Sequence, residues 1–276
     1  MGLADTVQNI EIPVRPEILD RLDAEVAKDD PDIRKIETLI GEDAGISASL
    51  IKTVNSPFYG SRSSATSVHK AVSMLGLDTV SRIVSGLALR KIAGSSNADL
   101  VDRMLKDSAD LALVSGYLAK RMGSAAPDQA FTFGLFQNCG ILLLARFKDY
   151  GEVFASSAGA DRRLIELEFE KYRFTHAHAG ALMAKSWRLS DSVAEAVRYH
   201  HDYEMISDQS GRISPESRDL IGLAFLAEWA IRYRAGFDKT AEWQAGAPFA
   251  MAHFGCHEEG FGAIAEEVQG LLGEDR

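Results

Sequence analysis

The stretch from Phe131 to Leu144 reads FTFGLFQNCGILLL. It is almost wholly apolar, which predicts burial, yet its middle carries two adjacent amides, Gln137 and Asn138. A buried amide that lacks a hydrogen-bond partner costs about 1–3 kcal/mol. Two such groups side by side in a buried helix therefore mark a site, or the remains of one.

The composition is that of an ordinary soluble globular protein, with 276 residues, 46% hydrophobic and 25% charged. No apolar run approaches the roughly 20 residues of a membrane span. The opening MGLADTVQNIEIP has neither the basic start nor the apolar block of a signal peptide. The two cysteines, Cys139 and Cys256, form no metal or redox motif. We therefore expect a cytoplasmic protein that makes no use of a membrane.

The formal net charge is −10, from 40 acidic and 30 basic residues. Such a surface repels phosphate backbones, so nucleic-acid binding would need a local basic patch. The densest candidates are Arg162–Arg163 and the pair Arg232 and Arg234, all within helical patterns. We expect these side chains to face solvent and expect no nucleic-acid partner.

Hydrophobic residues recur at helical spacing along the whole chain, and strand-like alternation is absent. This pattern predicts an all-α protein of two packed helical lobes, residues 10–97 and 98–205, with C-terminal helices at 206–276 that pack on the second lobe. The joint at Gly94–Asn97 is short, so we expect the lobes to share an interface and unfold together. Gly246–Pro248 is read as a turn.

Polar residues that could form a site occur on several of the predicted helices. His176, His200 and His201 lie downstream of the amide pair on otherwise apolar faces, and Asp107 lies upstream. Histidines and carboxylates that converge from several helices form the usual metal site of helical bundles. His178 is two residues from His176 and should point elsewhere.

This order resembles the HD superfamily of metal-dependent phosphohydrolases. In that superfamily a histidine on one helix, an adjacent His-Asp pair on the next, and later histidines hold one or two metals that activate a water. Here the adjacent pair is Gln137-Asn138, and Asp107 stands at the upstream histidine position.

The chain resembles the HDOD family, the HD-related output domain, more closely. The resemblance is carried by EDAGISASLIKTVNSPFYG (Glu42–Gly60), SVHKAVSMLGLDTV (Ser67–Val80) and HAHAGALMAKSWRLSDSVAEAVRYHHD (His176–Asp202). It implies an HDOD domain over residues 10–205 whose second lobe is a degenerate HD-like bundle. It also implies a non-catalytic bacterial signal-transduction module that acts in trans on other signalling proteins.

The chemistry of the pair agrees with a non-enzyme, because an amide is neither an anionic metal bridge nor a general base. The polar cluster of Asp107, Gln137, Asn138, His176, His200 and His201 is then a hydrogen-bond network without a cofactor. Two alternatives stay open. One is a residual phosphohydrolase in which Asp107, His176, His200 and His201 hold a divalent metal, and the other is a small-ligand or nucleotide sensor in a cleft between the lobes.

A partner surface or interlobe contact is a further hypothesis for Asn55, Phe58, Tyr59 and Arg62, which lie in or beside the motif Asn-Ser-Pro-Phe-Tyr-Gly. Asn55 is also read as a helix C-cap, and Phe58 and Tyr59 as packing aromatics. The sequence leaves the oligomeric state open.

Overall fold

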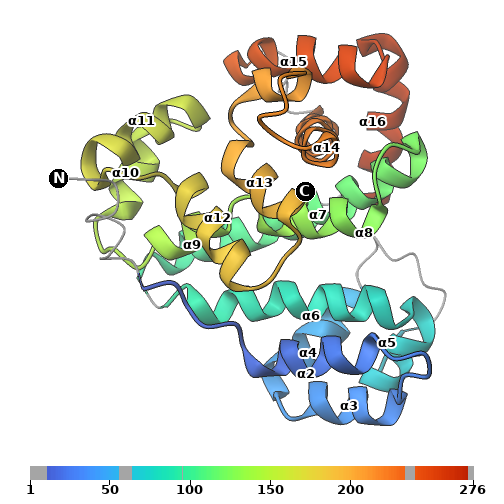
Figure 1. Ribbon diagram of the computed structural model, residues 1–276. Coiled ribbons are helices and arrows are strands. Elements are labelled where there is room, and N and C mark those ends of the chain that lie inside the picture. Colours follow the sequence, from blue (N-terminus) through green and yellow to red (C-terminus); the bar gives the residue numbers. More distant parts are fainter. Residues whose placement is uncertain (1–10, 56–63, 95, 234–239, 273–276) are drawn as a thin grey trace. The chain divides into compact units, whose positions relative to one another are not determined.

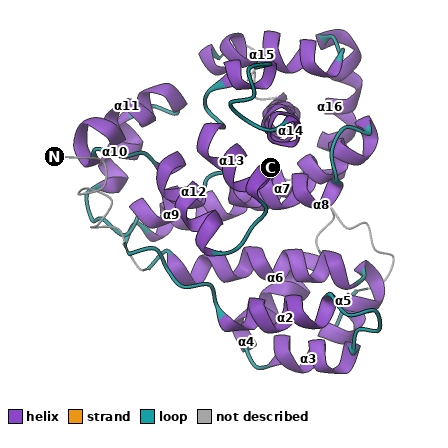
Figure 2. Cartoon of the chain, in the orientation of Figure 1, coloured by secondary structure: helices purple, strands orange, loops and turns teal. Residues whose placement is uncertain are grey.

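The computed structural model describes residues 11–55, 64–94, 96–233 and 240–272. Within these ranges the regular structure is helical and no strand occurs, so the predicted all-α class is confirmed (Figure 2). The chain divides into two compact units, with the change between Ile92 and Ala93. No helix among the described residues is both long and apolar enough to cross a bilayer.

The unit of residues 14–92 is a bundle of short helices (Figure 1). Its helices are α2 (Glu17–Val26), α3 (Ile33–Gly41), α4 (Ala44–Val54), α5 (Val68–Leu75) and α6 (Leu77–Ile92). The side chains of Asp32, Asp43 and Ser67 cap α3, α4 and α5 by accepting hydrogen bonds from first-turn N–H groups. Its core is aliphatic and includes Leu22, Ile36, Leu39, Ile40, Leu50 and Val54.

Asn55 is the C-cap of α4, and its side-chain amide bonds to the backbone of Ala65. Its Nδ2 donates to the carbonyl of Ala65 at 2.8 Å, and its Oδ1 accepts from the Ala65 N–H at 2.7 Å. The side chain is thus committed to the backbone of its own unit. Phe58, Tyr59 and Arg62 lie outside the described residues.

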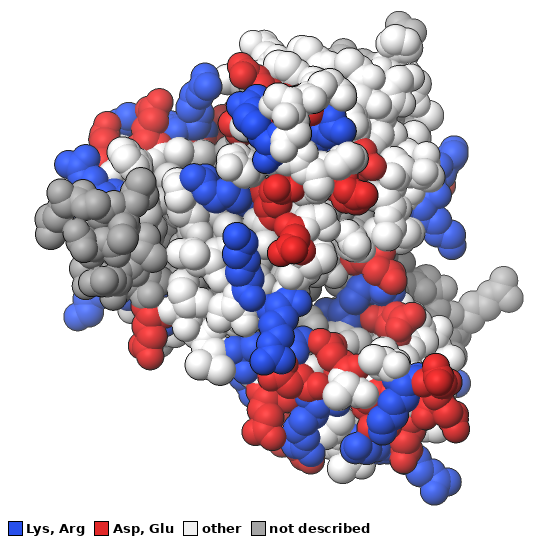
Figure 3. All heavy atoms as spheres, viewed as in Figure 1, with Lys and Arg blue, Asp and Glu red and all other residues white. Residues whose placement is uncertain are grey.

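Acidic and basic side chains are interspersed over the face of the molecule in Figure 3. Ion pairs among the described residues include Arg21 with Glu42 at 2.7 Å and Lys91 with Asp43. Arg163 pairs with Glu166. The acidic excess is therefore mixed with basic groups on this face.

The second unit holds the apolar stretch and the histidines. It consists of α7 (Ala98–Met122), α8 (Pro127–Phe136), α9 (Cys139–Leu144), α10 (Tyr150–Ser156), α11 (Asp161–Tyr172), α12 (His176–Ser186), α13 (Asp191–Tyr199), the 3-10 helix η2 (Tyr203–Ser207), α14 (Pro215–Arg232), α15 (Ala241–Phe254) and the greater part of α16 (Glu258–Leu272). The lead-in residues 11–13 group with this unit, where the Trp187 ring N–H donates to the Pro13 carbonyl at 3.0 Å.

The stretch 131–144 is not the single helix that its apolar character predicted. It breaks at Gln137–Asn138, where α8 ends and α9 begins. Just after the break α9 lies very close to α12, since a Cβ built on Gly140 would lie 1.9 Å from the His176 carbonyl oxygen. The break turns α9 onto α12 and leaves the amide pair at the joint.

The helices after residue 206 pack on this bundle, with α14 against α7 and α13, and α15 against α14. Trp229 of α14 stacks between Trp243 of α15 and Phe261 of α16. The turn expected at Gly246–Pro248 is wrong, because Pro248 lies inside α15. At Gly246 a Cβ would come within 2.5 Å of the Phe225 ring, so this glycine permits close helix packing and does not mark a turn.

Candidate functional site: a three-histidine cluster

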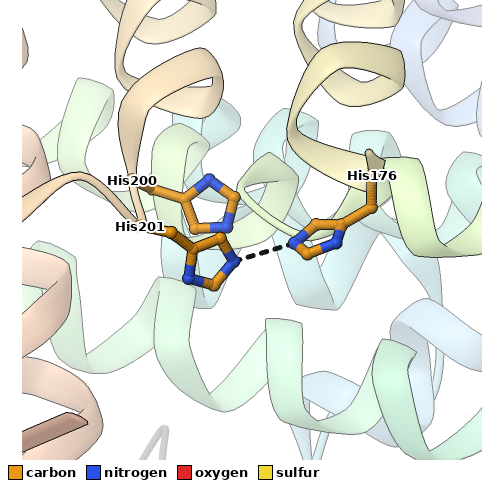
Figure 4. A group of neighbouring side chains, drawn as sticks. All are labelled: His176, His200 and His201. Carbon is orange, nitrogen blue, oxygen red and sulfur yellow. Dashed lines mark hydrogen bonds between the residues drawn. The ribbon is translucent and has the colours of Figure 1, made fainter. Parts of the chain in front are cut away.

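His176, His200 and His201 meet in the second unit (Figure 4). His176 is the first residue of α12, and His200 and His201 follow the last residue of α13. One ring nitrogen from each of the three lies within 4.8 Å of the others. The Nε2 atoms of His176 and His201 are 2.8 Å apart. The two helix ends therefore bring three imidazoles to one point.

Each imidazole is anchored through its other nitrogen, Nδ1. His176 Nδ1 lies 2.8 Å from Glu168 Oε2, and His200 Nδ1 lies 2.8 Å from the Val197 carbonyl. His201 Nδ1 lies 3.6 Å from Asp161 Oδ2. These contacts hold the rings in place and direct the Nε2 atoms toward one another.

Asn138 reaches this cluster through His200, whose Nε2 lies 3.2 Å from the amide. His200 is buried, and burial together with the charge on His176 lowers its pKa to about 3. The ring is therefore neutral, and since Nδ1 donates to the Val197 carbonyl, Nε2 must accept. The structure places Asn138 Oδ1 at this position, but two acceptors do not bond. Amide oxygen and nitrogen are assigned by such networks, so turning the amide over presents its N–H to His200 Nε2.

Glu168 of α11 is a central residue that the sequence reading missed. Its side chain is 0% exposed and accepts from three groups: the Tyr150 hydroxyl at 2.5 Å, the His176 backbone N–H at 2.8 Å, and His176 Nδ1. The signal available was its position four residues after Leu164 on the inner face of a charged helix. Nothing in the charge-rich pattern of α11 separated Glu168 from its solvent-facing neighbours.

The pKa values of the three histidines are shifted in different directions. Burial opposes charge on His176, but the Glu168 carboxylate outweighs it and the pKa of His176 is raised. Burial, with the other two histidines, holds the pKa of His201 well below its usual value. His176 Nε2–H thus donates to His201 Nε2, which leaves the His201 Nδ1–H facing Asp161.

Asp107 and Gln137 line the cavity of about 160 Å³ beside the histidines, together with Asn138. Gln137 is buried, whereas Asp107 is exposed at residue level. Asp107 contributes to a raised pKa of Glu228, which is caused mainly by burial. Among the described residues, the ligand atoms within 4.8 Å of one another belong to the three histidines, whereas the expected set also included Asp107.

The same cavity carries charged residues that the sequence did not single out, among them Asp161, Glu228 and Arg232. Glu228 pairs with Arg232 at 2.8 Å. Burial, followed by the charge of Glu228, raises the pKa of Asp161 to about 7. Asp161 therefore carries a proton in a substantial fraction of molecules at neutral pH.

The donor set fits one divalent cation and does not fit two. Three neutral imidazole nitrogens with anchored second nitrogens are a common ligand set for zinc and similar ions. A two-metal site needs an anionic bridge, and the pair nearest the histidines is the neutral Gln137-Asn138. The same Nε2 atoms serve either a hydrogen-bond network or one metal ion, and the metal would have to displace the proton on His176.

The HDOD domain model matches residues 12–203. The chain therefore belongs to the HDOD domain family, which is related to the HD phosphohydrolases. The family expectation from the sequence is confirmed.

Solved structures share the fold. A protein of Shewanella amazonensis SB2B, provisionally named a phosphohydrolase, is 22% identical with a TM-score of 0.68, covering 96% of this chain and 93% of that one. A protein of Marinobacter aquaeolei VT8, provisionally named a signal transduction protein, is 23% identical with a TM-score of 0.68, covering 95% of this chain and 58% of that one. An uncharacterized curated relative from Treponema pallidum (strain Nichols) is 25% identical over 248 residues, and the match spans 85% of this chain but only 44% of that protein's length.

Proposed function

We propose that this chain is a non-catalytic bacterial signal-transduction domain that acts in trans through contacts with other signalling proteins. The observation that carries the proposal is Asn138, whose side-chain amide lies 3.2 Å from His200 Nε2 at the joint of α8 and α9. A neutral amide there can neither bridge two metal ions nor take a proton from a water. The name of the Marinobacter aquaeolei structure is in keeping with this role.

The carboxylates around the cluster support the same reading. Glu168 already accepts from Tyr150 and twice from His176, so it has little capacity left for a substrate proton. Asp161 retains a proton near neutral pH because burial and Glu228 raise its pKa. Neither Glu168 nor Asp161 is therefore an ionised carboxylate that is free to act as a base beside a bound metal.

The test for catalysis uses protein purified without metal-affinity resin. It is incubated with manganese and with nucleotides, cyclic dinucleotides and bis(4-nitrophenyl) phosphate, and we expect no turnover above background. His176→Ala serves as the site variant, and His253→Ala, a histidine that pairs with Asp219 away from the cluster, is the matched control. Metal-dependent turnover that is lost only in His176→Ala would overturn the non-catalytic reading.

The test for signalling is capture of partners from the native host by cross-linking to the intact chain. We expect signalling proteins to be enriched over a control capture with the heat-unfolded chain. An enrichment profile identical to that control would count against action in trans.

A second candidate function is favoured by the arrangement of the three Nε2 atoms within 4.8 Å. Such a site would hold one divalent metal and could support single-metal hydrolysis, since one bound cation lowers the pKa of a water. Metal analysis of the same resin-free protein separates the two candidates. Stoichiometric zinc, iron or manganese that is lost in His200→Gln would favour this candidate, and a metal-free protein would exclude it.

A further inference from the structure

Helices α12 and α13 each present side chains to two cavities. His176 lines the cavity at the histidine cluster, whereas His178 and Arg198 line a neighbouring cavity of about 820 Å³. Asp161, His201 and Tyr203 line both cavities. His178 is two residues beyond His176, which turns it about 200° around the helix and away from the cluster. A volume of this size is typical of small-molecule sites.

The protons on His178 follow from its neighbours. A guanidinium can only donate, so the 2.5 Å contact from Arg198 Nη2 makes His178 Nε2 an acceptor. The Nδ1 atom then carries the proton and donates to the Thr175 hydroxyl oxygen at 2.8 Å. Thr175 is buried and is the N-cap residue of α12. His178 is therefore a neutral ring, held at both ends, that fixes the guanidinium of Arg198.

Arg198 is half-buried and lies over the ring of Tyr199, 5.3 Å from its centroid. Among the residues that the structure describes, no carboxylate lies within ion-pair distance of this guanidinium. Its direct hydrogen-bond partner is the neutral His178. The positive charge thus stands on the cavity wall without a paired anion, while its fork retains further N–H donors.

Five carboxylates line the same cavity, namely Asp161, Glu166, Asp202, Glu204 and Glu242. The charge of Asp202 acts on Arg198, although the two make no ion pair. Glu166 and Glu242 are engaged elsewhere. Glu166 pairs with Arg163 at 3.2 Å, and Glu242 accepts from the Asp161 backbone N–H at 3.0 Å. Both contacts are made on α11, because Arg163, Glu166 and Asp161 all belong to that helix. Glu166 and Glu242 do not neutralise Arg198.

The remaining lining includes apolar and aromatic groups. Ala241, Ala245 and Phe249 stand four residues apart on one face of α15, and Ile165 of α11 and Tyr203 of η2 complete the set. Small side chains at two of the α15 positions leave room beside Phe249. The guanidinium fork of Arg198 stands on one wall, and the apolar and aromatic groups form another part of the lining. This pairing fits a ligand whose anionic head binds Arg198 and whose body is apolar.

We propose that this cavity is a second ligand site, in which Arg198, positioned by His178, binds the head group of a small organic oxyanion with an aromatic or apolar body. A guanidinium fork recognises carboxylates and phosphate monoesters alike through paired N–H···O contacts. The site lies within one unit of the chain and is carried by residues that the proposed signalling function does not use. The proposal goes beyond that function because it assigns the domain a small-molecule ligand.

The probes are benzoate and phenyl phosphate, with benzyl alcohol as the uncharged counterpart. Each is titrated into the intact ¹⁵N-labelled chain, and the backbone amides of Ala177 and Tyr199 report binding by NMR. We expect at least one anion to shift these amides in a saturable way. Benzyl alcohol should bind about 10–100-fold more weakly, the loss expected when a charged hydrogen-bonded pair is removed. The relative affinities of the two anions identify the head group.

The variant Arg198→Met should weaken the anion by the same roughly 10–100-fold and leave benzyl alcohol unchanged. Arg163→Met is the charge-matched control, because Arg163 pairs with Glu166 but does not itself line the cavity. This variant should bind the anion like the original chain. Arg198→Lys keeps the charge without the fork and guards against a folding defect, and we expect an intermediate affinity. Equal anion affinity in Arg198→Met, or no amide shift at roughly 10 mM of either anion, would overturn the proposal. Its failure would leave the partner-capture result untouched, so the two proposals fail separately.

Discussion

Replacing Glu168 by glutamine tests the support of the histidine cluster. Glu168 is fully buried, and its two oxygens accept from the Tyr150 hydroxyl, the His176 backbone N–H and His176 Nδ1. Glutamine has nearly the same shape but offers one acceptor oxygen and one NH₂ group. Whichever way the amide turns, one of the donors around it loses its acceptor.

The magnitude follows from these contacts. If the amide oxygen faces His176, the Tyr150 hydroxyl proton loses its acceptor, and the bond from His176 Nδ1 loses the negative charge of its carboxylate acceptor. An unsatisfied buried group costs about 1–3 kcal/mol, and a bond to a charged group contributes about 1.5–3 kcal/mol. We expect Glu168→Gln to lower the free energy of unfolding by about 2–4 kcal/mol. In a protein of this size the melting temperature should fall by roughly 5–15 °C.

The assay is urea unfolding followed by circular dichroism, with the His176 pKa measured by NMR on the same samples. Glu170→Gln, on the exposed side of the same helix, is the matched control and should change stability by no more than about 0.5 kcal/mol. The pKa of His176 should fall in Glu168→Gln, because the carboxylate that raises it is gone. A Glu168→Gln protein within about 1 kcal/mol of the original, with an unchanged His176 pKa, would refute the account of Glu168 as the anchor.

Three further predictions concern the amide pair and His200. Asn138→Asp places a charge beside His200 and should raise its pKa in an NMR titration; an unchanged value would mean that the two do not touch. Gln137→His combined with Asn138→Asp should gain manganese affinity by calorimetry, and absence of binding heat at millimolar metal would contradict a latent ligand set. The pKa of His200 is lowered to about 3 in the folded protein, whereas the ordinary pKa of histidine is near 6.5. The contribution of the neutral ring to stability is therefore fully present above pH 6.5 and is lost as the pH falls toward 3. The free energy of unfolding should fall by at most about 1.4 kcal/mol per pH unit from this cause. Urea unfolding of the original chain and of His200→Gln, compared from about pH 7 to about pH 4, measures the effect. If the free energy of unfolding changes equally with pH in both proteins, His200 is not a buried neutral ring.

The sequence determined the helical class and many helix ends, because these depend on neighbours within a few residues. Apolar spacing set the faces, and Ser190 and Ser214 accept from first-turn N–H groups as cap residues do. The family followed from motifs that are local in the chain. The direction of His178 away from His176 likewise follows from helix geometry alone.

Only the tertiary structure decided where the polar groups go. The break at Gln137 stands beside the approach of α9 to α12 at Gly140, a contact between segments some 40 residues apart. Glu168 belongs to a charged helix, yet Tyr150 and His176 enclose it. Burial of a charge depends on what covers it, and the covering residues come from other helices.

Arg198 shows the same limit. The sequence places it two residues before the histidine pair but says nothing of the neutral ring that receives its N–H or of the cavity it faces. A local pattern fixes the angle at which a side chain leaves its helix. Whether it then meets solvent, a carboxylate or an imidazole is set by helix packing, which is a property of the whole chain.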